Sequence, residues 1–395
     1  MREITCVVVG GGYAGIHAAK EMAKSLSEGA KSGLRLRLIV IDKNSDHLRK
    51  VLLFKPAAAR EKITVPLEAL LPDGAERVQA EVTRVEVERK RVVYVDPEGK
   101  EHELSYDVLV LAAGSVVRSP GPEQGGVPLK DVAAAEQIRA VWQANIEQAA
   151  RTADPLERRR LLTLVVAGAG ISGIETSAEL ASAMRGEVGG RGVDPAEVTV
   201  YLCNAHSRLF PEGPAKVGEK LEQSLVSLGV TVLHGTKVIR EANRVVSLSG
   251  GREIPAGLCV WTLGLSPNPM LRKMGLPLTG DGYIQVDSYY RVSGAPGVYS
   301  IGDCAHIIDP VTGRPDGKTC KEATAQAARL AKVVLADLTG EPAPPHRGYM
   351  DLFCFGLGPG QGLVWTRKWG LDLMLAGKLG WRIRKYTWDL ASLLK

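Results

Sequence analysis

The sequence predicts an α/β protein with two domains built on parallel sheets, the second inserted in the first, and a small C-terminal domain. Three observations support this prediction. The length of 395 residues suits two to three domains of ~150 residues. Glycine makes up 44 of the 395 residues, about 11% against the usual ~7%. Two clusters of these glycines lie in the same setting, after an apolar run and before a helical stretch.

The composition excludes several other classes of protein. With 45% hydrophobic and 24% charged residues, the chain is neither disordered nor fibrous. No apolar run approaches the ~18 residues of a membrane span, and the early first strand predicts no signal peptide. The cysteines are scattered without a Cys-x-x-Cys pair, which argues against disulfides, a metal site or a redox dithiol and predicts a cytoplasmic protein. They are Cys6, Cys203, Cys259, Cys304, Cys320 and Cys354.

The first glycine cluster belongs to a unit of strand, turn, helix and strand. Its parts are the strand 4–9, the turn 10–15, a helix from 16 to about 27, the strand 36–41 and Asp42. Gly10 permits a tight turn, Gly12 lets the backbone approach a pyrophosphate, and Gly15 allows close packing of helix and strand. The helix N-terminus attracts phosphates, and Asp42 can bind ribose hydroxyls. The unit predicts a Rossmann-like dinucleotide-binding domain with a polar insertion around 25–33.

The same unit occurs a second time. Its parts are the apolar run 161–167, the turn 168–173, a helix to about Met184 and the strand 198–203. The segments that follow also match, 91–94 and 103–114 in the first copy and 244–247 and 256–264 in the second. Each copy is therefore predicted to contain a β-meander and a return strand that ends in glycine. One glycine turn is weak evidence, whereas two with matching flanks predict two Rossmann-like domains.

A third motif, Gly297-Val-Tyr-Ser-Ile-Gly-Asp303, completes a resemblance to the flavoproteins with two dinucleotide-binding domains, over roughly residues 4–335. The resemblance implies FAD on the first domain and NAD(P)H on the second. In that family the Asp of the third motif binds the ribityl chain, and the next helix points its N-terminus at the isoalloxazine ring. The implied FAD-binding residues are Gly10, Gly12, Tyr13, Ala14, Gly15, Asp42, Lys43, Val82, Ala113, Gly114, Gly302 and Asp303. Those implied for NAD(P)H are Gly168, Gly170, Ile171, Ser172, Gly173, Asn204 and Gly264.

Proline- and glycine-rich segments set the predicted domain boundaries. The crossovers are 115–128 and 265–269, a stiff linker is 341–348, and the charged stretch 154–160 is a solvated helix end. The predicted domains are 1–120 (FAD-binding, first part), 121–265 (NAD(P)-binding), 266–340 (FAD-binding, second part) and 341–395 (C-terminal).

Within this superfamily, the segments 173–180 and 260–269 and the basic C-terminal region are similar to the type II NADH dehydrogenases. The disulfide reductase branch is excluded, because no paired cysteines follow the first strand and helix. The resemblance implies an FAD-dependent NAD(P)H dehydrogenase that passes electrons to a quinone or another small-molecule acceptor. Such an enzyme must hold nicotinamide C4 roughly 3–3.5 Å from flavin N5. The alternatives are a soluble oxidoreductase acting on a biosynthetic small molecule or redox protein, and a nucleotide-binding sensor without activity.

Three residues are candidates for catalysis. Glu175 lies in the first turn after the second glycine cluster, and in the type II family a Glu here lies between flavin and nicotinamide. Its alternative role is to stabilise a helix N-terminus. The family's glutamine-rich helix start beside the quinone site is replaced here by 321–327, which keeps one glutamine, Gln326, or, in the alternative register 325–328, by a segment that loses both members of the glutamine pair. Lys321 and Glu322 place charge there, suited to another acceptor or a proton relay, and a surface ion pair explains them equally well.

The nicotinamide site departs from the usual pattern at Asn204. An acid normally ends this strand. Asn204 can bind a ribose hydroxyl but lacks the charge that repels a 2′-phosphate, so the preference between NADH and NADPH is open. The neighbouring His206 and Arg208 are either ordinary loop residues or phosphate ligands.

The C-terminal segment concentrates charge and tryptophan. Residues 361–395 hold seven basic and two acidic residues, hence +5 of the total net charge of +6, and four of the six tryptophans. A basic patch alone would suit nucleic acid, but Trp mixed with Lys and Arg favours a membrane surface, and no nucleic-acid partner is predicted. Trp365, Trp369, Leu373 and Ala376 have the spacing of one helical face. We expect this segment to lie on the inner face of the cell membrane, and the alternatives are packing on the parent domain or a homodimer contact.

Overall fold

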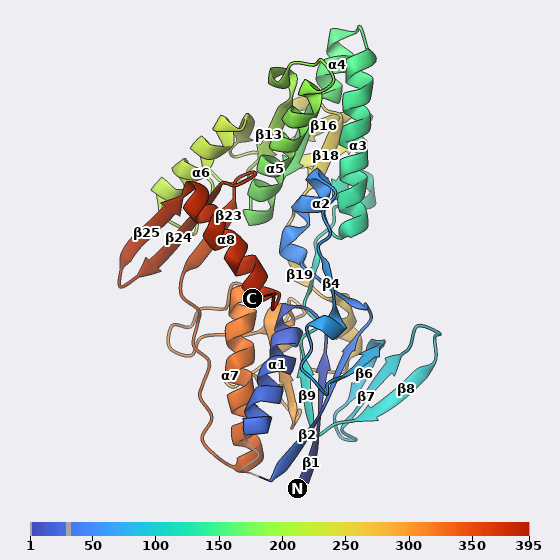
Figure 1. The fold of residues 1–395 in the computed structure, drawn as a ribbon, viewed down its shortest axis with the longest axis vertical. Helices are drawn as coiled ribbons and strands as arrows, with labels where there is room; N and C mark the ends of the chain where they lie inside the picture. Colours follow the sequence, from blue (N-terminus) through green and yellow to red (C-terminus); the bar gives the residue numbers. More distant parts are fainter. Residues whose placement is uncertain (1, 29–32, 395) are drawn as a thin grey trace.

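The computed structural model describes residues 2–28 and 33–394 and shows two Rossmann-like domains, one above the other in Figure 1. The first has a five-stranded parallel sheet in the order β21-β9-β1-β2-β5. Helices α1 and α7 cover one face, and the three-stranded meander β6-β7-β8 covers the other. The strands are β1 (Arg2–Val9), β2 (Leu34–Asp42), β5 (Glu76–Gln79), β6 (Glu81–Glu86), β7 (Arg91–Val95), β8 (Glu101–Ser105), β9 (Val108–Leu111) and β21 (Val298–Ser300). The helices are α1 (Tyr13–Glu28) and α7 (Cys320–Thr339).

The second domain repeats this arrangement. Its parallel sheet has the order β11-β18-β12-β13-β14, with helices on one face and the meander β15-β16-β17 on the other. Its strands are β11 (Val127–Pro128), β12 (Thr163–Ala167), β13 (Thr199–Cys203), β14 (Val230–Leu233), β15 (Val238–Ala242), β16 (Val245–Leu248), β17 (Glu253–Pro255) and β18 (Leu258–Trp261). Its helices are α3 (Val132–Arg151), α4 (Pro155–Leu161), α5 (Ile171–Gly189) and α6 (Ala215–Ser227). The predicted fold class is confirmed, as is a meander in each copy. Residues 29–32 of the predicted polar insertion lie outside the described residues, and α1 extends to Glu28.

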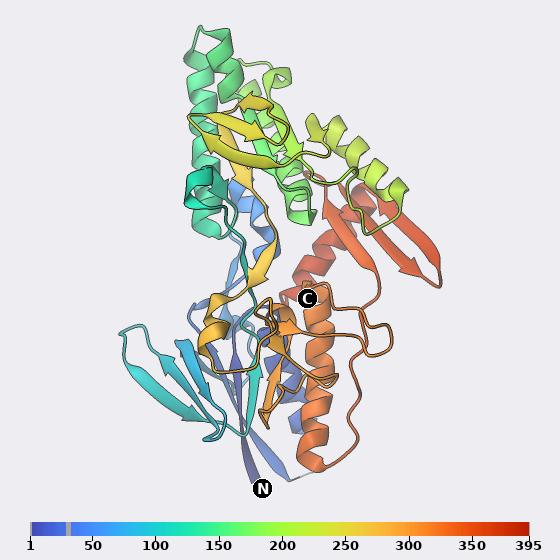
Figure 2. The ribbon, with the colours of Figure 1, turned by 180° about the vertical axis from the view of Figure 1, so that it is seen from behind.

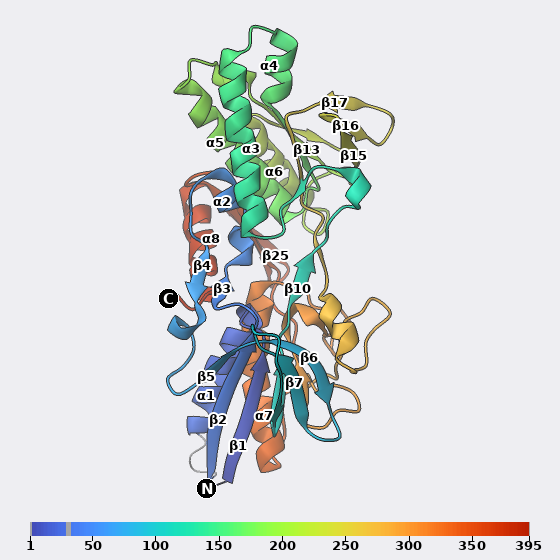
Figure 3. The same cartoon turned by 90° about the vertical axis from the view of Figure 1, so that its right-hand side faces the viewer.

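Two chain segments cross between the domains and pair with each other. They are β10 (Ser115–Val117) and β19 (Leu265–Pro267), which form an antiparallel ribbon. Figures 2 and 3 show these segments joining the upper and lower domains. Because β10 follows β9 of the first sheet and β19 follows β18 of the second, the ribbon places the carboxyl edges of the two sheets on either side of the junction.

Shorter elements complete the two domains. They include β3 (Asp46–Leu48), β4 (Thr64–Pro66), β20 (Ile284–Gln285), β22 (Ala305–His306) and α2 (Phe54–Ala58). The 3₁₀ helices are η2 (Lys50–Leu52), η3 (Leu67–Ala69), η4 (Pro122–Gln124), η5 (Pro195–Glu197), η6 (Pro269–Lys273) and η7 (Gly302–Cys304). Helix α2 lies between β2 and β5 of the first domain in sequence but packs in the core of the second domain, where Trp142 Nε1 donates to Ala57 O at 2.9 Å.

The C-terminal domain consists of a three-stranded antiparallel sheet and one helix. Its elements are β23 (Leu352–Gly356), β24 (Gly362–Lys368), β25 (Leu371–Ala376) and α8 (Gly377–Ala391). The prediction that Trp365, Trp369, Leu373 and Ala376 share a helical face is wrong, because they lie in the β24–β25 hairpin. Trp369 and Gly370 have φ of 51° and 76°, as in two-residue hairpin turns in which both central residues have positive φ. The spacing of i, i+4 and i+8 is even, so it also fits a strand.

Candidate active site

The first glycine turn is shaped to receive a phosphate group. Gly10 has φ of 109°, where a side chain would be strained, and a Cβ on Gly15 would lie 1.7 Å from Gly10 O. A Cβ on Gly12, by contrast, would meet no protein atom within 4 Å. Asp42 Oδ2 accepts a hydrogen bond of 2.6 Å from Gly11 N. The turn thus combines close helix–strand packing with open space at Gly12, and both suit a bound dinucleotide.

The second glycine turn has nearly the same geometry. Gly168 has φ of 111°, and a Cβ on Gly173 would lie 1.8 Å from Gly168 O. Gly170 caps the N-terminus of α5, and a Cβ there would meet nothing within 4 Å. Helix α5 therefore offers the unpaired N–H groups of its first turn, which include those of Ile171 and Ser172, beside an open cradle.

The other predicted nucleotide residues surround these two turns. Gly114 and Gly264 end equivalent segments with φ of 65° and 81°, and a Cβ on either would meet open space. A Cβ on Gly302 would lie 2.7 Å from Ala14 Cβ, so the third motif packs directly on the start of α1 beside Tyr13. The remaining residues predicted to bind FAD are Ala113, Lys43 and Val82. The carbonyl oxygen of Ala113 accepts from Asn268 Nδ2 at 3.1 Å, and that of Lys43 accepts from Gln79 Nε2 at 3.3 Å. Val82 is buried in β6. Both domains thus fit a dinucleotide, and the assignment of FAD to the first and NAD(P)H to the second stays a prediction.

Asp303 is the centre of a polar cluster beside the first turn. Its Oδ2 accepts from Ser115 Oγ at 2.7 Å, and Lys50 Nζ donates to Ser115 O at 2.8 Å. Burial raises the pKa of Asp303, while Ser115, Lys50 and Lys318 oppose that rise. Burial also lowers the pKa of Lys50 and of Lys318, with Asp303 opposing the change in both. Sequence reasoning missed both lysines, because nothing in the local pattern indicates that they converge on Asp303.

Glu175 is bound to the C-terminal domain. Arg384 of α8 donates to both of its carboxylate oxygens, at 2.9 and 3.0 Å, and Gly356 N donates at 2.7 Å. Burial raises the pKa of Glu175, and Arg384 is the main opposing influence. The Glu175 carboxyl group therefore links α5 to the C-terminal domain. Its contact with nicotinamide stays a prediction. The charge partner was not foreseen, because it lies 209 residues away in sequence.

The start of α7 uses its charged residues locally. Glu322 accepts from Thr319 N at 2.7 Å and Gly317 N at 2.6 Å, so it caps the helix. Lys321 Nζ donates to Leu352 O of β23, which joins α7 to the C-terminal domain. These contacts differ from the ion pair considered as an alternative, and catalytic roles for both residues stay predictions.

The remaining glutamine of this segment also faces inward. Gln326 Oε1 accepts from Gly302 N at 2.7 Å, and its Nε2 donates to Asp316 Oδ2 at 2.7 Å. Gln326 therefore supports the third motif instead of lining a site for an acceptor.

Asn204 is buried, and its side chain points away from the glycine turn. Its Nδ2 donates to Arg208 O at 2.9 Å and to His234 Nδ1 at 3.0 Å, while His206 N donates to its Oδ1 at 3.2 Å. The amide is thus held by protein partners at both of its polar atoms, and the contact of Asn204 with a ribose stays a prediction.

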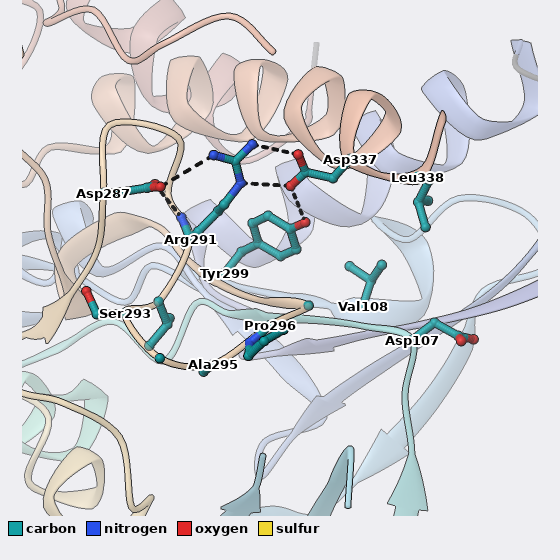
Figure 4. Close-up of a pocket in the computed structure, with 13 residues that line it drawn as sticks. Asp107, Val108, Asp287, Arg291, Ser293, Ala295, Pro296, Tyr299, Asp337 and Leu338 are labelled. Carbon is teal, nitrogen blue, oxygen red and sulfur yellow. Dashed lines mark hydrogen bonds and ion pairs between the residues drawn. The ribbon is translucent and has the colours of Figure 1, made fainter. Parts of the chain in front are cut away.

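A separate pocket of about 540 Å³ lies at the opposite edge of the first sheet (Figure 4). Asp107 and Gly297 in its wall directly precede β9 and β21, so the pocket is at the amino ends of these strands. Arg291 donates to both oxygens of Asp337, and Tyr299 OH donates to Asp337 at 2.7 Å. Ligands of open parallel sheets bind at the carboxyl ends, so this pocket is not the dinucleotide site. Among the described residues, no group of three or more His, Cys, Asp or Glu could hold a metal ion.

Comparison with known proteins defines the class. Residues 4–328 match the model of the pyridine nucleotide-disulphide oxidoreductase family. An NADH dehydrogenase-like protein of Mycobacterium tuberculosis is 30% identical over 76% of this chain and 72% of its own. The chain therefore belongs to this oxidoreductase family and, within it, to the type II NADH dehydrogenase-like proteins.

Two further relatives resemble the chain over nearly its whole length. The type II NADH:quinone oxidoreductase of Staphylococcus aureus is 25% identical over 94% of this chain and 91% of its own. The structure of NDH2 from Plasmodium falciparum in complex with NADH has a TM-score of 0.82 at 16% identity, covering 100% of this chain and 97% of that one. The structural likeness extends through the C-terminal domain.

Proposed function

We propose that this protein is an FAD-dependent NAD(P)H dehydrogenase that passes electrons to a quinone-like acceptor. The observation that supports this most is the pair of open glycine cradles, at Gly12 and Gly170, on two sheets whose carboxyl edges flank one junction. The type II NADH:quinone oxidoreductases among the relatives supply the class of acceptor. The alternative is a soluble oxidoreductase acting on a biosynthetic small molecule or redox protein.

Different residues would bind the two cofactors. Gly12, Gly114 and Asp303 would hold FAD, and Gly170 and Gly264 would hold the nicotinamide nucleotide. When bound, FAD would supply the redox chemistry, which is hydride acceptance from reduced nicotinamide and two-electron transfer to a second acceptor.

The protein's own part in this reaction is positioning and electrostatics. Lys50 and Lys318 place two positive charges beside Asp303, where they can stabilise negative charge on a reduced cofactor. The C-terminal domain contacts the second domain through Glu175 and α7 through Lys321, so it covers one side of the junction.

The test is anaerobic mixing of the FAD-loaded protein with NADH, followed by a screen of acceptors. We expect the flavin absorbance to bleach and then to recover on addition of a short-chain quinone, with ping-pong steady-state kinetics. Recovery only with other acceptors would support the soluble oxidoreductase. A flavin that NADH and NADPH both fail to reduce would refute the proposal and leave a nucleotide-binding sensor.

We infer further that the C-terminal domain rests on an anionic membrane surface. No helix among the described residues is long and apolar enough to cross a membrane. The β24–β25 hairpin and the start of α8 nevertheless expose large apolar side chains next to Lys368, Lys378 and Arg382. Trp369 at the hairpin turn is 87% exposed. The other exposed apolar residues of these elements include Leu371, Leu373, Met374, Leu375 and Leu379.

Sedimentation with liposomes tests this inference. Lys385 is bound to Asp389 at 2.9 Å, so we choose Lys378→Glu/Arg382→Glu for charge reversal. Basic residues near an anionic leaflet contribute ~1 kcal/mol each, so the variant should lose binding to phosphatidylserine vesicles at low salt. Arg89→Glu/Lys90→Glu, on the exposed β6–β7 turn, is the matched control. If the wild-type protein does not bind these vesicles but forms a dimer through the β24–β25 hairpin, the homodimer alternative is correct.

A further inference from the structure

The two domains permit a direct comparison of the residue that follows the second strand. In the first sheet Val9 is paired with Ile41, and in the second Ala167 is paired with Cys203. The residues after these partners are Asp42 and Asn204, which therefore occupy equivalent positions beside their glycine turns. In dinucleotide-binding domains this position contacts the adenosine ribose.

The two side chains behave differently. Asp42 points at its own glycine turn, where its Oδ2 accepts from Gly11 N at 2.6 Å. Asn204 is 3% exposed and points away from its turn, toward Arg208 O and His234 Nδ1. No negative charge from this position reaches the ribose end of the second cradle.

A hydrogen-bond network holds the amide in this orientation. The two hydrogens on Asn204 Nδ2 are donated to Arg208 O and to His234 Nδ1. His234 then accepts at Nδ1, and its Nε2 lies 3.1 Å from Glu222 Oε2, to which it can donate. A carboxylate at this position could not donate the hydrogen bonds to Arg208 O and His234 Nδ1. The local structure therefore favours an amide here.

The arginine of the loop after Asn204 is also engaged by its own backbone. The Arg208 guanidinium donates to the carbonyl oxygens of Phe210, Pro211 and Gly213, at 2.7–2.9 Å, and so holds its own loop. Ala205, His206 and Ser207 are the exposed residues directly after Asn204. His206 can donate to a phosphate, but no arginine from this loop is free to bind it in a bidentate manner.

We propose that the second domain accepts NADPH as well as NADH with little discrimination, and that the inward-turned Asn204 is the residue that determines this. The proposal rests on the assignment of the second cradle to the nicotinamide nucleotide. At this position the 2′-phosphate of NADPH would meet an amide instead of a carboxylate, and the Arg208 guanidinium is held by its own loop, so we expect neither nucleotide to be strongly favoured.

Calorimetric binding of NAD⁺ and NADP⁺ and the kcat/KM for NADH and NADPH test the proposal. For the wild-type protein we expect the two nucleotides to agree within about tenfold in both measurements, because neither gains or loses more than ~1.4 kcal/mol at the 2′ position. Asn204→Glu should raise the NADH/NADPH ratio of kcat/KM about tenfold through repulsion of the phosphate. Asn204→Gln has the same length without the charge and should leave the ratio unchanged.

A second variant avoids the buried network. His206→Glu places the acid on the exposed stretch and should shift the ratio in the same direction, even where Asn204→Glu fails to fold. Wild-type preference for one nucleotide by more than about a thousandfold would overturn the proposal. An equal shift with Asn204→Gln and Asn204→Glu would also overturn it, since charge would then be irrelevant. Binding of neither nucleotide would instead refute the proposed function.

Discussion

Replacing Arg384 by methionine should weaken the docking of the C-terminal domain on the second domain. The side chains of Arg384 and Glu175 are 8% and 2% exposed, and they form two hydrogen bonds of 2.9 and 3.0 Å. Without the guanidinium, the Glu175 carboxylate would stay buried with Gly356 N as its remaining donor. Breaking such a buried pair costs about 3–5 kcal/mol, so the variant should unfold at a clearly lower urea concentration.

The loss of folding stability in Arg384→Met should be smaller at low pH than at high pH. Burial raises the pKa of Glu175, and removal of Arg384 should raise it further. A carboxyl group whose pKa is higher in the folded state stabilises the fold at low pH, and this contribution is lost as pH rises through the folded pKa. The deficit of Arg384→Met relative to wild type should therefore be smaller near pH 5 than near pH 8.

Urea unfolding followed by tryptophan fluorescence measures both effects. Arg367→Met is the control, because its ion pair with Asp372 is exposed and its loss should leave the midpoint unchanged. The double variant Glu175→Leu/Arg384→Met should be more stable than Arg384→Met alone, since no uncompensated charge remains. An Arg384→Met midpoint equal to that of wild type would refute the reasoning.

Two other predictions concern the cofactors. Asp303→Ala should reduce the FAD content of the purified protein, and full FAD content with an unchanged rate of flavin reduction would show that the third motif is misassigned. Gly12→Ala and Gly170→Ala add a methyl group in open space, so both should fold normally by circular dichroism. Gly12→Ala should lower FAD content alone, whereas Gly170→Ala should raise the KM for NAD(P)H alone, and the opposite pattern would exchange the two nucleotide assignments.

The parts of the site that sequence predicted correctly depend on local backbone geometry. Gly10 and Gly168 need positive φ, and Gly15 and Gly173 sit against the backbone five residues earlier. Such requirements act over a few residues and recur at fixed spacing, so they can be predicted from the sequence without knowledge of the fold. The third motif was identified by its resemblance to a flavoprotein motif, and in the structure Gly302 has φ of 73° and packs on Ala14.

The errors arose where two local patterns were equivalent or where a partner was remote. The spacing of Trp365 and Trp369 fits both a helix and a strand, and the positive φ of Trp369 in its turn decided between them. The contact of Asn204 with a ribose stays a prediction, but its hydrogen bond to His234, 30 residues away, could not be inferred from its position alone.

By itself, then, the sequence determined the duplicated fold, the two open cradles and the class of cofactor, because glycine spacing and strand hydrophobicity are local properties. Tertiary structure alone decided the partners of the charged groups. Arg384 on Glu175, Lys50 beside Asp303 and helix α2 in the core of the second domain all join segments far apart in the chain. Such contacts depend on how whole helices and strands pack against one another. The free energy of this packing comes from surfaces that several elements contribute together, so no short stretch of sequence determines it.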